Sequence, residues 1–169
     1  IGHSTRDMEE FLHILKTYKI TQLVDVRTLP GSRKFPQYDK ENMEVALPEN
    51  GILYIHKKNL GGLRHTTKES INTGWHNKSF RAYADYMQTD EFKEALGELM
   101  NLSKEKTTVI MCAEAVPWRC HRSLIGDALL LRDYEVLDIF SEKKTQAHKL
   151  TSFAKVDGLK ITYPEIIEE

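Results

Sequence analysis

The sequence predicts one α/β domain over residues 1–169, a Rossmann-like three-layer sandwich built around a mainly parallel sheet. Short, β-branched apolar runs alternate along the chain with segments whose apolar residues follow helical spacing. Such alternation is typical of βαβ units, whose right-handed crossovers place helices on both faces of a sheet. A chain of 169 residues with 40% hydrophobic content can bury one substantial core, so we expect a single domain.

The first third of the chain predicts two helices and two strands. Asp7 and Glu10 form a capping box ahead of apolar residues at helical spacing, so a helix should begin there. The apolar run 20–26 ends shortly before Pro30 and Gly31, which indicates a buried strand that leads into a loop. The next expected elements are a helix over 40–47 and a strand over 52–56.

The alternation resumes after one irregular stretch. No period survives over residues 57–78, and an irregular segment of this length favours a functional loop or lid over a simple connection. Helical spacing returns at Phe80, with a break near Thr89. The later expected elements are helices over 80–87, 92–99, 124–131 and 146–153, strands over 107–112, 135–140 and 160–163, and a frayed tail over 165–169.

Composition excludes several classes of protein. With 24 Lys plus Arg against 25 Asp plus Glu, the net charge of -1 gives no overall field that attracts nucleic acid or an anionic membrane. No apolar run approaches the roughly 20 residues that span a bilayer, so we expect a cytoplasmic protein without a membrane partner. Two cysteines are too few for a secreted disulfide scaffold. Because residue 1 is Ile, we also expect a short preceding piece that completes a strand ending at Ile1.

Polar side chains follow several expected strands at the points where the strands end. In open α/β sheets, the carboxyl ends of the strands form the rim where ligands bind, because loop amides and helix amino termini converge there. The sequence therefore predicts a pocket at this rim. The side chains that we expect there are His3, Ser4, Thr5, Arg6, Asp25, Arg27 and Cys112.

A loop with a cysteine at each end joins the strand over 107–112 to the next helix. Cys120 lies where that helix should begin, so unpaired helix amides and the adjacent Arg119 and Arg122 favour its thiolate, which makes it a candidate nucleophile or redox-active thiol. Cys112 leaves an apolar strand, and both catalysis and inert packing are open interpretations. The loop lacks the glycines and the spacing of the phosphatase signature, so phosphatase chemistry has weak support.

The other titratable candidates each have a structural alternative. Glu114 can serve as an acid or base, orient a ribose hydroxyl, or form a solvated ion pair. Asp25 lies in a buried strand and needs a partner, which Arg27 can supply as scaffolding. His3 and His121 can act as general acids or bases, or can simply bond to backbone carbonyls.

Metal binding is not predicted. Cys112, Cys120, His121 and His3 could supply four nitrogen and sulfur ligands, but their spacing matches no common zinc motif and adjacent ligands seldom point the same way. No cofactor is assigned.

The distribution of arginine indicates the chemistry of the ligand. Six arginines fall in expected loops or helix starts near the rim, and a guanidinium fork suits phosphate or carboxylate, although some of the six should form ordinary ion pairs. A small anionic ligand is therefore the expected partner, with nucleic acid a less favoured one because no basic helix or aromatic-basic strip stands out. These arginines are Arg6, Arg27, Arg33, Arg64, Arg119 and Arg122.

Four ordered motifs together resemble domain of unknown function family 488, over nearly the whole chain. They are Gly2-His3-Ser4-Thr5-Arg6, Asp25-Val26-Arg27 with Pro30, Ser32 and Arg33, Leu60-Gly61-Gly62, and Cys112-Ala113-Glu114 with Cys120-His121-Arg122. The resemblance implies an intracellular α/β protein and implies no particular activity. It supports the treatment of the four motifs as parts of one site, which adds Ser32, Arg33, Gly61, Gly62 and Arg122 to the expected binding residues.

Two classes of function remain open. The favoured class is an enzyme that acts on a phosphate-bearing substrate such as a nucleotide or nucleic acid, with arginines that hold the anion. The alternative is a non-catalytic nucleotide or nucleic-acid binding module whose cysteines pack or form a redox-sensitive pair. The expected catalytic residues of the enzyme are Cys112, Glu114, Cys120 and His121. The sequence assigns no oligomeric state.

Overall fold

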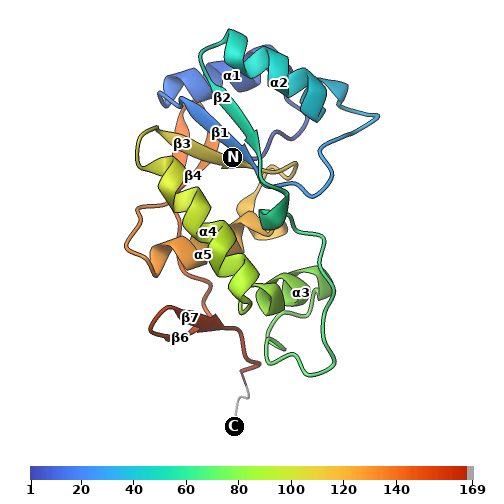
Figure 1. Cartoon of the computed structure of the whole chain (residues 1–169), viewed down its shortest axis with the longest axis vertical. Coiled ribbons are helices and arrows are strands. Elements are labelled where there is room, and N and C mark those ends of the chain that lie inside the picture. Colours follow the sequence, from blue (N-terminus) through green and yellow to red (C-terminus); the bar gives the residue numbers. More distant parts are fainter. Residues whose placement is uncertain (167–169) are drawn as a thin grey trace.

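A computed structural model describes residues 1–166 and has a parallel three-stranded sheet at its centre. The strands lie in the order β2-β1-β3, with β1 (Gln22–Asp25) paired to both neighbours (Figure 1). The chain start lies beside β3, because Gly2 forms a parallel bridge with Cys112. The expected α/β class is confirmed. The outer strands are β2 (Leu53–His56) and β3 (Thr108–Met111).

Helices cover both faces of this sheet. Successive residues of a strand point to opposite faces, and in β1 the side chains on both faces are apolar and pack against helices. Leu23 belongs to an apolar cluster with residues of α1 and α2, whereas Val24 belongs to a second cluster with residues of α4 and α5. Figure 1 shows α1 and α2 on one side of the strands and α4 and α5 on the other. The helices are α1 (Met8–Thr17), α2 (Lys40–Glu49), α3 (Lys78–Tyr86), α4 (Asp90–Ser103) and α5 (Arg122–Leu130).

The helix starts follow the local capping chemistry. Asp7 accepts a hydrogen bond from the Glu10 amide at 2.7 Å, which confirms the predicted first helix and its cap. Thr89 caps α4 by accepting a bond from the Phe92 amide, at the predicted break between the two helices. The helix after the cysteine loop begins at Arg122, slightly later than the predicted start near Cys120.

Of two expectations for the carboxyl-terminal third, one is confirmed and one is wrong. The strand expected over 135–140 exists as β4 (Leu137–Ser141), but it pairs antiparallel with β5 (Lys144–Ala147) and not with β1–β3. The helix expected over 146–153 is absent from the structure of these residues. His148 is the reason, since its amide donates to the Val136 carbonyl and its ring bonds to Asp127 and Asp138, which holds the chain extended.

The last expected strand is confirmed as β7 (Lys160–Thr162), which forms a hairpin with β6 (Lys155–Asp157). Gly158 sits in the turn with a φ of 62°, a left-handed conformation that favours glycine. The expected frayed tail begins at Glu165, which lies in no helix or strand, and its last part, 167–169, lies outside the described residues.

A buried carboxylate on α5 ties this carboxyl-terminal segment to the core. Asp127 is fully buried and accepts bonds from His148 Nε2 at 2.9 Å, Thr151 Oγ1 at 2.6 Å and the Tyr163 hydroxyl at 2.9 Å. Burial alone would lower the pKa of His148, but its bonds to Asp127 and Asp138 raise that pKa to about 9. His148 is therefore charged at neutral pH.

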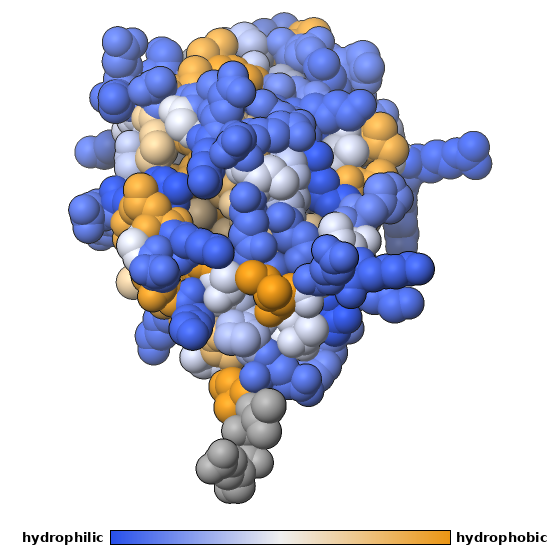
Figure 2. All heavy atoms as spheres, turned by 60° about the horizontal axis from the view of Figure 1, so that its bottom comes forward, coloured by the Kyte–Doolittle hydropathy of each residue, from blue (hydrophilic) through white to orange (hydrophobic). Residues whose placement is uncertain are grey.

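Exposed apolar residues are dispersed on the face shown in Figure 2, where small hydrophobic patches alternate with hydrophilic residues. Within residues 1–166, no helix has both the length and the apolar character needed to cross a bilayer.

His148 should contribute stability that is lost as the pH rises above neutrality. Its pKa is about 9 in the folded protein against an ordinary value of 6.5, so its contribution is complete below pH 6.5 and is lost as the pH rises through 9. We expect the free energy of unfolding of the wild type to fall by about 1–3 kcal/mol more than that of His148→Gln between pH 6 and pH 10, as measured by urea unfolding.

Tyr163→Phe is the matched control for this experiment. It removes one donor to Asp127 but keeps the histidine, so stability should drop at every pH while the slope against pH stays close to that of the wild type. The same slope in wild type and His148→Gln would contradict the assignment.

Candidate active site

The structure brings the four motifs of the sequence together at the carboxyl ends of β1 and β3. The amides of His3 and Ser4 donate to the carbonyls of Cys112 and Ala113, both at 2.9 Å. Gly2 is pressed against the same loop, since a Cβ at this position would lie 1.6 Å from the Glu114 carbonyl oxygen. The start of the chain and the cysteine loop therefore form one wall of a shared rim.

Asp25 and Arg27 form the buried ion pair that the sequence indicates. Asp25 is fully buried, and its carboxylate accepts bonds from Arg27 Nε at 2.9 Å and Arg27 Nη2 at 2.7 Å. The Tyr54 hydroxyl donates to the same carboxylate at 2.5 Å. Since Arg27 Nη2 also donates to the Tyr38 carbonyl, only Nη1 of this guanidinium remains directed toward the rim, 3.4 Å from His3 Nε2.

The ring of His3 is neutral and fixed. Burial lowers its pKa, and Nδ1 donates to the Ser4 carbonyl at 2.8 Å, so Nε2 carries the lone pair that faces Arg27. The ring stacks on Tyr38 with the centroids 4.1 Å apart. His3 therefore presents a hydrogen-bond acceptor at the rim.

The buried side chain of Arg122 holds the cysteine loop in place by hydrogen bonds. Its side chain is buried, and Nη1 donates to the Cys112 sulfur at 2.7 Å and to the Glu114 carbonyl at 2.6 Å. Nη2 donates to the Ala115 carbonyl at 3.2 Å. These contacts commit the guanidinium to the loop, so Arg122 positions the site and does not face a ligand.

The two thiols differ sharply in their acidity. Burial raises the pKa of Cys112, but a hydrogen bond from Cys120 and the charge of Arg122 outweigh it and lower that pKa to about 6. The pKa of Cys120 is raised by its bond to Cys112 and by burial. The geometry thus favours Cys112 as the thiolate, whereas the position of Cys120 in the sequence favours Cys120. The hydrogen bond from Cys120 and the guanidinium contact at 2.7 Å are together the reason for the reversal.

His121 links this pair to β1. Nε2 donates to the Val26 carbonyl at 2.8 Å, and Nδ1 lies 3.6 Å from the Cys120 sulfur. Burial lowers the pKa of His121 to about 4, so the ring is neutral at physiological pH and its Nδ1 is an acceptor. His121 therefore accepts or orients the proton on Cys120.

The segment 57–78, which the sequence predicts to be irregular, contacts the site through Gly61 and Gly62. A Cβ at Gly61 would lie 2.4 Å from Thr28 Oγ1, and one at Gly62 would lie 2.6 Å from His121 Nδ1. Only glycine permits this approach of the backbone to the ring. We conclude that both glycines pack the segment against the rim.

Two adjoining hollows open at the rim and share Arg27, Ala113 and Glu114. The larger, of about 560 Å³, is called the His3 pocket, and the smaller, of about 350 Å³, the Cys pocket. The exposed Glu114 side chain stands between them. The His3 pocket is also lined by His3, Ser4, Thr5, Thr28, Ser32, Lys34 and Phe35, and the Cys pocket by Gly62, Asn77, Ser79, Phe80, Cys112, Arg119, Cys120 and His121.

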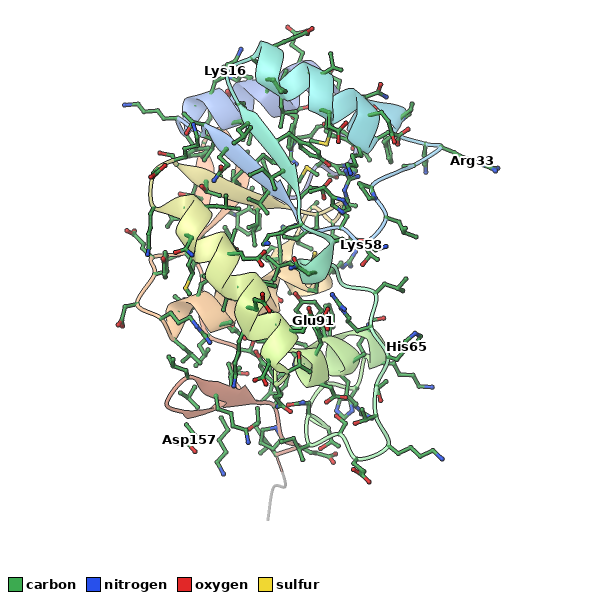
Figure 3. The ribbon with its side chains drawn as sticks, viewed as in Figure 1. Lys16, Arg33, Lys58, His65, Glu91 and Asp157 are labelled. Atoms are coloured by element: carbon green, nitrogen blue, oxygen red, sulfur yellow. The ribbon has the colours of Figure 1, made fainter. Side chains whose placement is uncertain are left out.

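Several expected ligand-binding residues do not line either pocket. Arg6 donates to the carbonyls of Gly2 and Phe140, and Arg64 donates to those of Gly61 and Asn59. Arg33 lies at the tip of an exposed loop and points away from the molecule (Figure 3). Asp25, Gly61 and Arg122 lie behind the pocket walls. The cleft is therefore less positive than the number of arginines indicates.

Some pocket residues were not predicted from the sequence. Lys34 and Phe35 line the His3 pocket, and Asn77, Ser79 and Phe80 line the Cys pocket. Asn77 caps α3, and its type ahead of an apolar-spaced segment was a detectable helix signal. The approach of α3 to the cysteine loop is a long-range contact, which residue spacing does not reveal.

The cysteine loop also offers unpaired donors. Within residues 1–166, the backbone N–H groups of Ala113, Glu114 and Ala115 donate no hydrogen bond. Free amides beside a thiolate suit an anionic group. In the same part of the chain, no three His, Cys, Asp or Glu side chains converge in an arrangement that could hold a metal ion.

The fold and the site define an α/β protein with a cysteine-containing cleft at the carboxyl ends of its parallel strands. The chain belongs to the family described as Domain of unknown function DUF488, which matches residues 7–129. This match confirms the resemblance and covers three of the four motifs, while Gly2-His3-Ser4-Thr5-Arg6 directly precedes it. No curated protein and no solved structure matches the chain.

Substitution of the glycine beside His121 tests the packing of the site. Gly62→Ala should lower the free energy of unfolding by about 1–3 kcal/mol, because the new methyl group overlaps the His121 ring. Urea unfolding measures the change.

Gly97→Ala provides the matched control. Gly97 lies within α4 with no atom within 4 Å of an added Cβ, so this variant should gain about 0.5–1 kcal/mol. Equal stability changes in the two variants would show that Gly62 is not in close contact.

Proposed function

We propose that the protein is an enzyme that acts on a small anionic or phosphate-bearing substrate, related to nucleotides or nucleic acid, in the cleft formed by the His3 and Cys pockets. The contact between Arg122 and the Cys112 sulfur carries the proposal. A guanidinium bound to a buried sulfur holds a thiolate ready at neutral pH, and a thiolate is the reactive form of cysteine. Inert packing of a thiol requires no such partner.

Each other group at the rim receives a role from its geometry. Arg27 Nη1 and the unpaired amides of Ala113 and Glu114 bind the anionic group of the substrate. The exposed Glu114 carboxylate lies beside both pockets and serves as general acid or base. Cys112 is the nucleophile.

The two pockets support a substrate with two distinct parts. Phe35 lines the His3 pocket and Phe80 lines the Cys pocket, so each hollow offers an aromatic surface beside polar groups. A nucleotide combines a flat ring with a charged group and fits this pattern. We further propose that residues 1–169 form one Rossmann-like three-layer domain of a cytoplasmic protein. The apolar clusters on both faces of the sheet and the unbridged cysteines support this assignment.

One observation favours a second candidate, a non-catalytic nucleotide or nucleic-acid binding module. Cys112 and Cys120 are only 3% and 5% exposed, as is usual for packed cysteines. In that case Arg27 and the loop amides bind the ligand and the thiols only support the loop. Thiol reactivity separates the two candidates.

Alkylation by iodoacetamide tests the nucleophile. The rate at Cys112 should rise through a pH of about 6 and level off above it, whereas an ordinary thiol continues to gain reactivity up to a pH of about 9. Mass spectrometry identifies the labelled residue. Inorganic phosphate or a nucleotide should slow the labelling, because the anion covers the loop amides.

Cys120→Ser and Cys120→Ala form the matched pair of variants. Serine can still donate a hydrogen bond to Cys112 and should keep most of its acidity, whereas alanine cannot and should move the midpoint upward. Labelling of Cys112 that follows an ordinary thiol profile, without protection by phosphate or nucleotide, would leave the binding module as the better candidate.

A further inference from the structure

We propose that Cys112 and Cys120 form a reversible intramolecular disulfide, so that the site is a thiol–disulfide couple that reduces a hydroperoxide. The proposal goes beyond the action on an anionic substrate and does not depend on it. It rests on the placement of the only two sulfhydryl groups of the chain.

The fold brings these two buried cysteines from separate segments to one pocket. Cys112 follows β3 and Cys120 precedes α5, and both residues line the Cys pocket. The Arg122 amide donates to the Cys120 sulfur at 3.5 Å, while its guanidinium donates to the Cys112 sulfur at 2.7 Å. One residue therefore holds both sulfurs.

The pair is asymmetric in the way that a two-step oxidation requires. Cys112 is the anionic partner because Arg122 compensates its charge, so it is the attacking sulfur. Cys120 keeps its proton, with His121 Nδ1 at 3.6 Å, and is the resolving thiol. Both cysteines line the Cys pocket, which is the route by which a small oxidant would reach them.

The chemistry balances with a hydroperoxide as the oxidant. The Cys112 thiolate attacks the terminal oxygen, the O–O bond breaks, and Cys112 becomes a sulfenic acid while hydroxide or an alkoxide leaves. The Cys120 sulfur then attacks the Cys112 sulfur, so that the S–S bond forms and the S–O bond breaks. The departing hydroxyl takes the Cys120 proton and leaves as water. Two electrons pass from the sulfurs to the peroxide, and an external thiol restores the reduced pair.

Arg122 also sets the direction of the equilibrium. Disulfide formation removes the negative charge that faces this buried guanidinium, so the fold favours the reduced state. A disulfide whose reduced form is stabilised is easily reduced. The couple is therefore suited to repeated turnover with cellular thiols.

Peroxide treatment followed by mass spectrometry tests the proposal. The reduced protein is exposed to hydrogen peroxide at neutral pH, quenched with acid, unfolded and alkylated. Wild-type protein should lose two hydrogen atoms per chain, resist alkylation at both cysteines, and recover both thiols with dithiothreitol. Both thiols still free after treatment, irreversible Cys112 sulfinic acid, or a disulfide between two chains would overturn the proposal.

Single substitutions assign the two roles. With dimedone present, Cys120→Ser should give one adduct at Cys112, and Cys112→Ser should give none. An adduct at Cys120 would overturn the assigned order.

Arg122→Met tests the role of the guanidinium, with circular dichroism as the check on folding. This variant should lower the equilibrium constant for reduction of the disulfide by glutathione about tenfold or more, because the reduced form loses the cation that stabilises the Cys112 thiolate. Arg122→Lys should restore part of that loss, and equal constants in all three proteins would overturn the role of Arg122.

Discussion

The buried guanidinium of Arg122 is the constraint on which the rest of the site depends. A buried cation needs acceptors, and Arg122 finds them in the Cys112 sulfur and two carbonyls of the loop. The same contacts shape the loop, join the end of β3 to the start of α5, and determine which sulfur carries charge. Gly2 completes this arrangement, because any side chain at that position would collide with the Glu114 carbonyl and approach Arg122.

Arg27 and Arg122 illustrate different uses of a buried charge. Arg27 has a carboxylate partner, Asp25, whose oxygens accept three bonds from it, so this pair is scaffolding. Arg122 has no carboxylate among its contacts, and the one partner that can become anionic is Cys112. Arg27 therefore has a carboxylate, Asp25, as its counter-charge, whereas Arg122 has only the Cys112 sulfur, which is anionic when it loses its proton. That difference concentrates reactivity at a single sulfur.

The sequence predicted the elements that depend on local pattern. Helical spacing and the Asp7 cap located the first helix, and the topology rule for parallel strands placed His3, Asp25 and Cys112 on one rim. The family resemblance added Gly61 and Gly62 to that site. It did not identify the more acidic thiol, because the acidity of Cys112 depends on where the Arg122 side chain points. The hairpin of β4 and β5 was missed because tertiary bonds from His148 override the local helical pattern. Likewise, nothing local shows that Arg6 bonds to the distant Phe140 carbonyl.

The hydrogen bonds to Asp127 show that the packed structure extends beyond the residues that the family model matches. The family match stops at residue 129, yet every side chain that donates to Asp127 comes from residues 148–163. A chain that ended at residue 129 would keep the cysteine loop but would lose the side chains that donate to Asp127. Its carboxylate would then have no hydrogen-bond donor from these residues, in the middle of α5, the helix that carries Arg122. The residues that follow the family match are therefore needed to satisfy the buried carboxylate of the helix that carries Arg122.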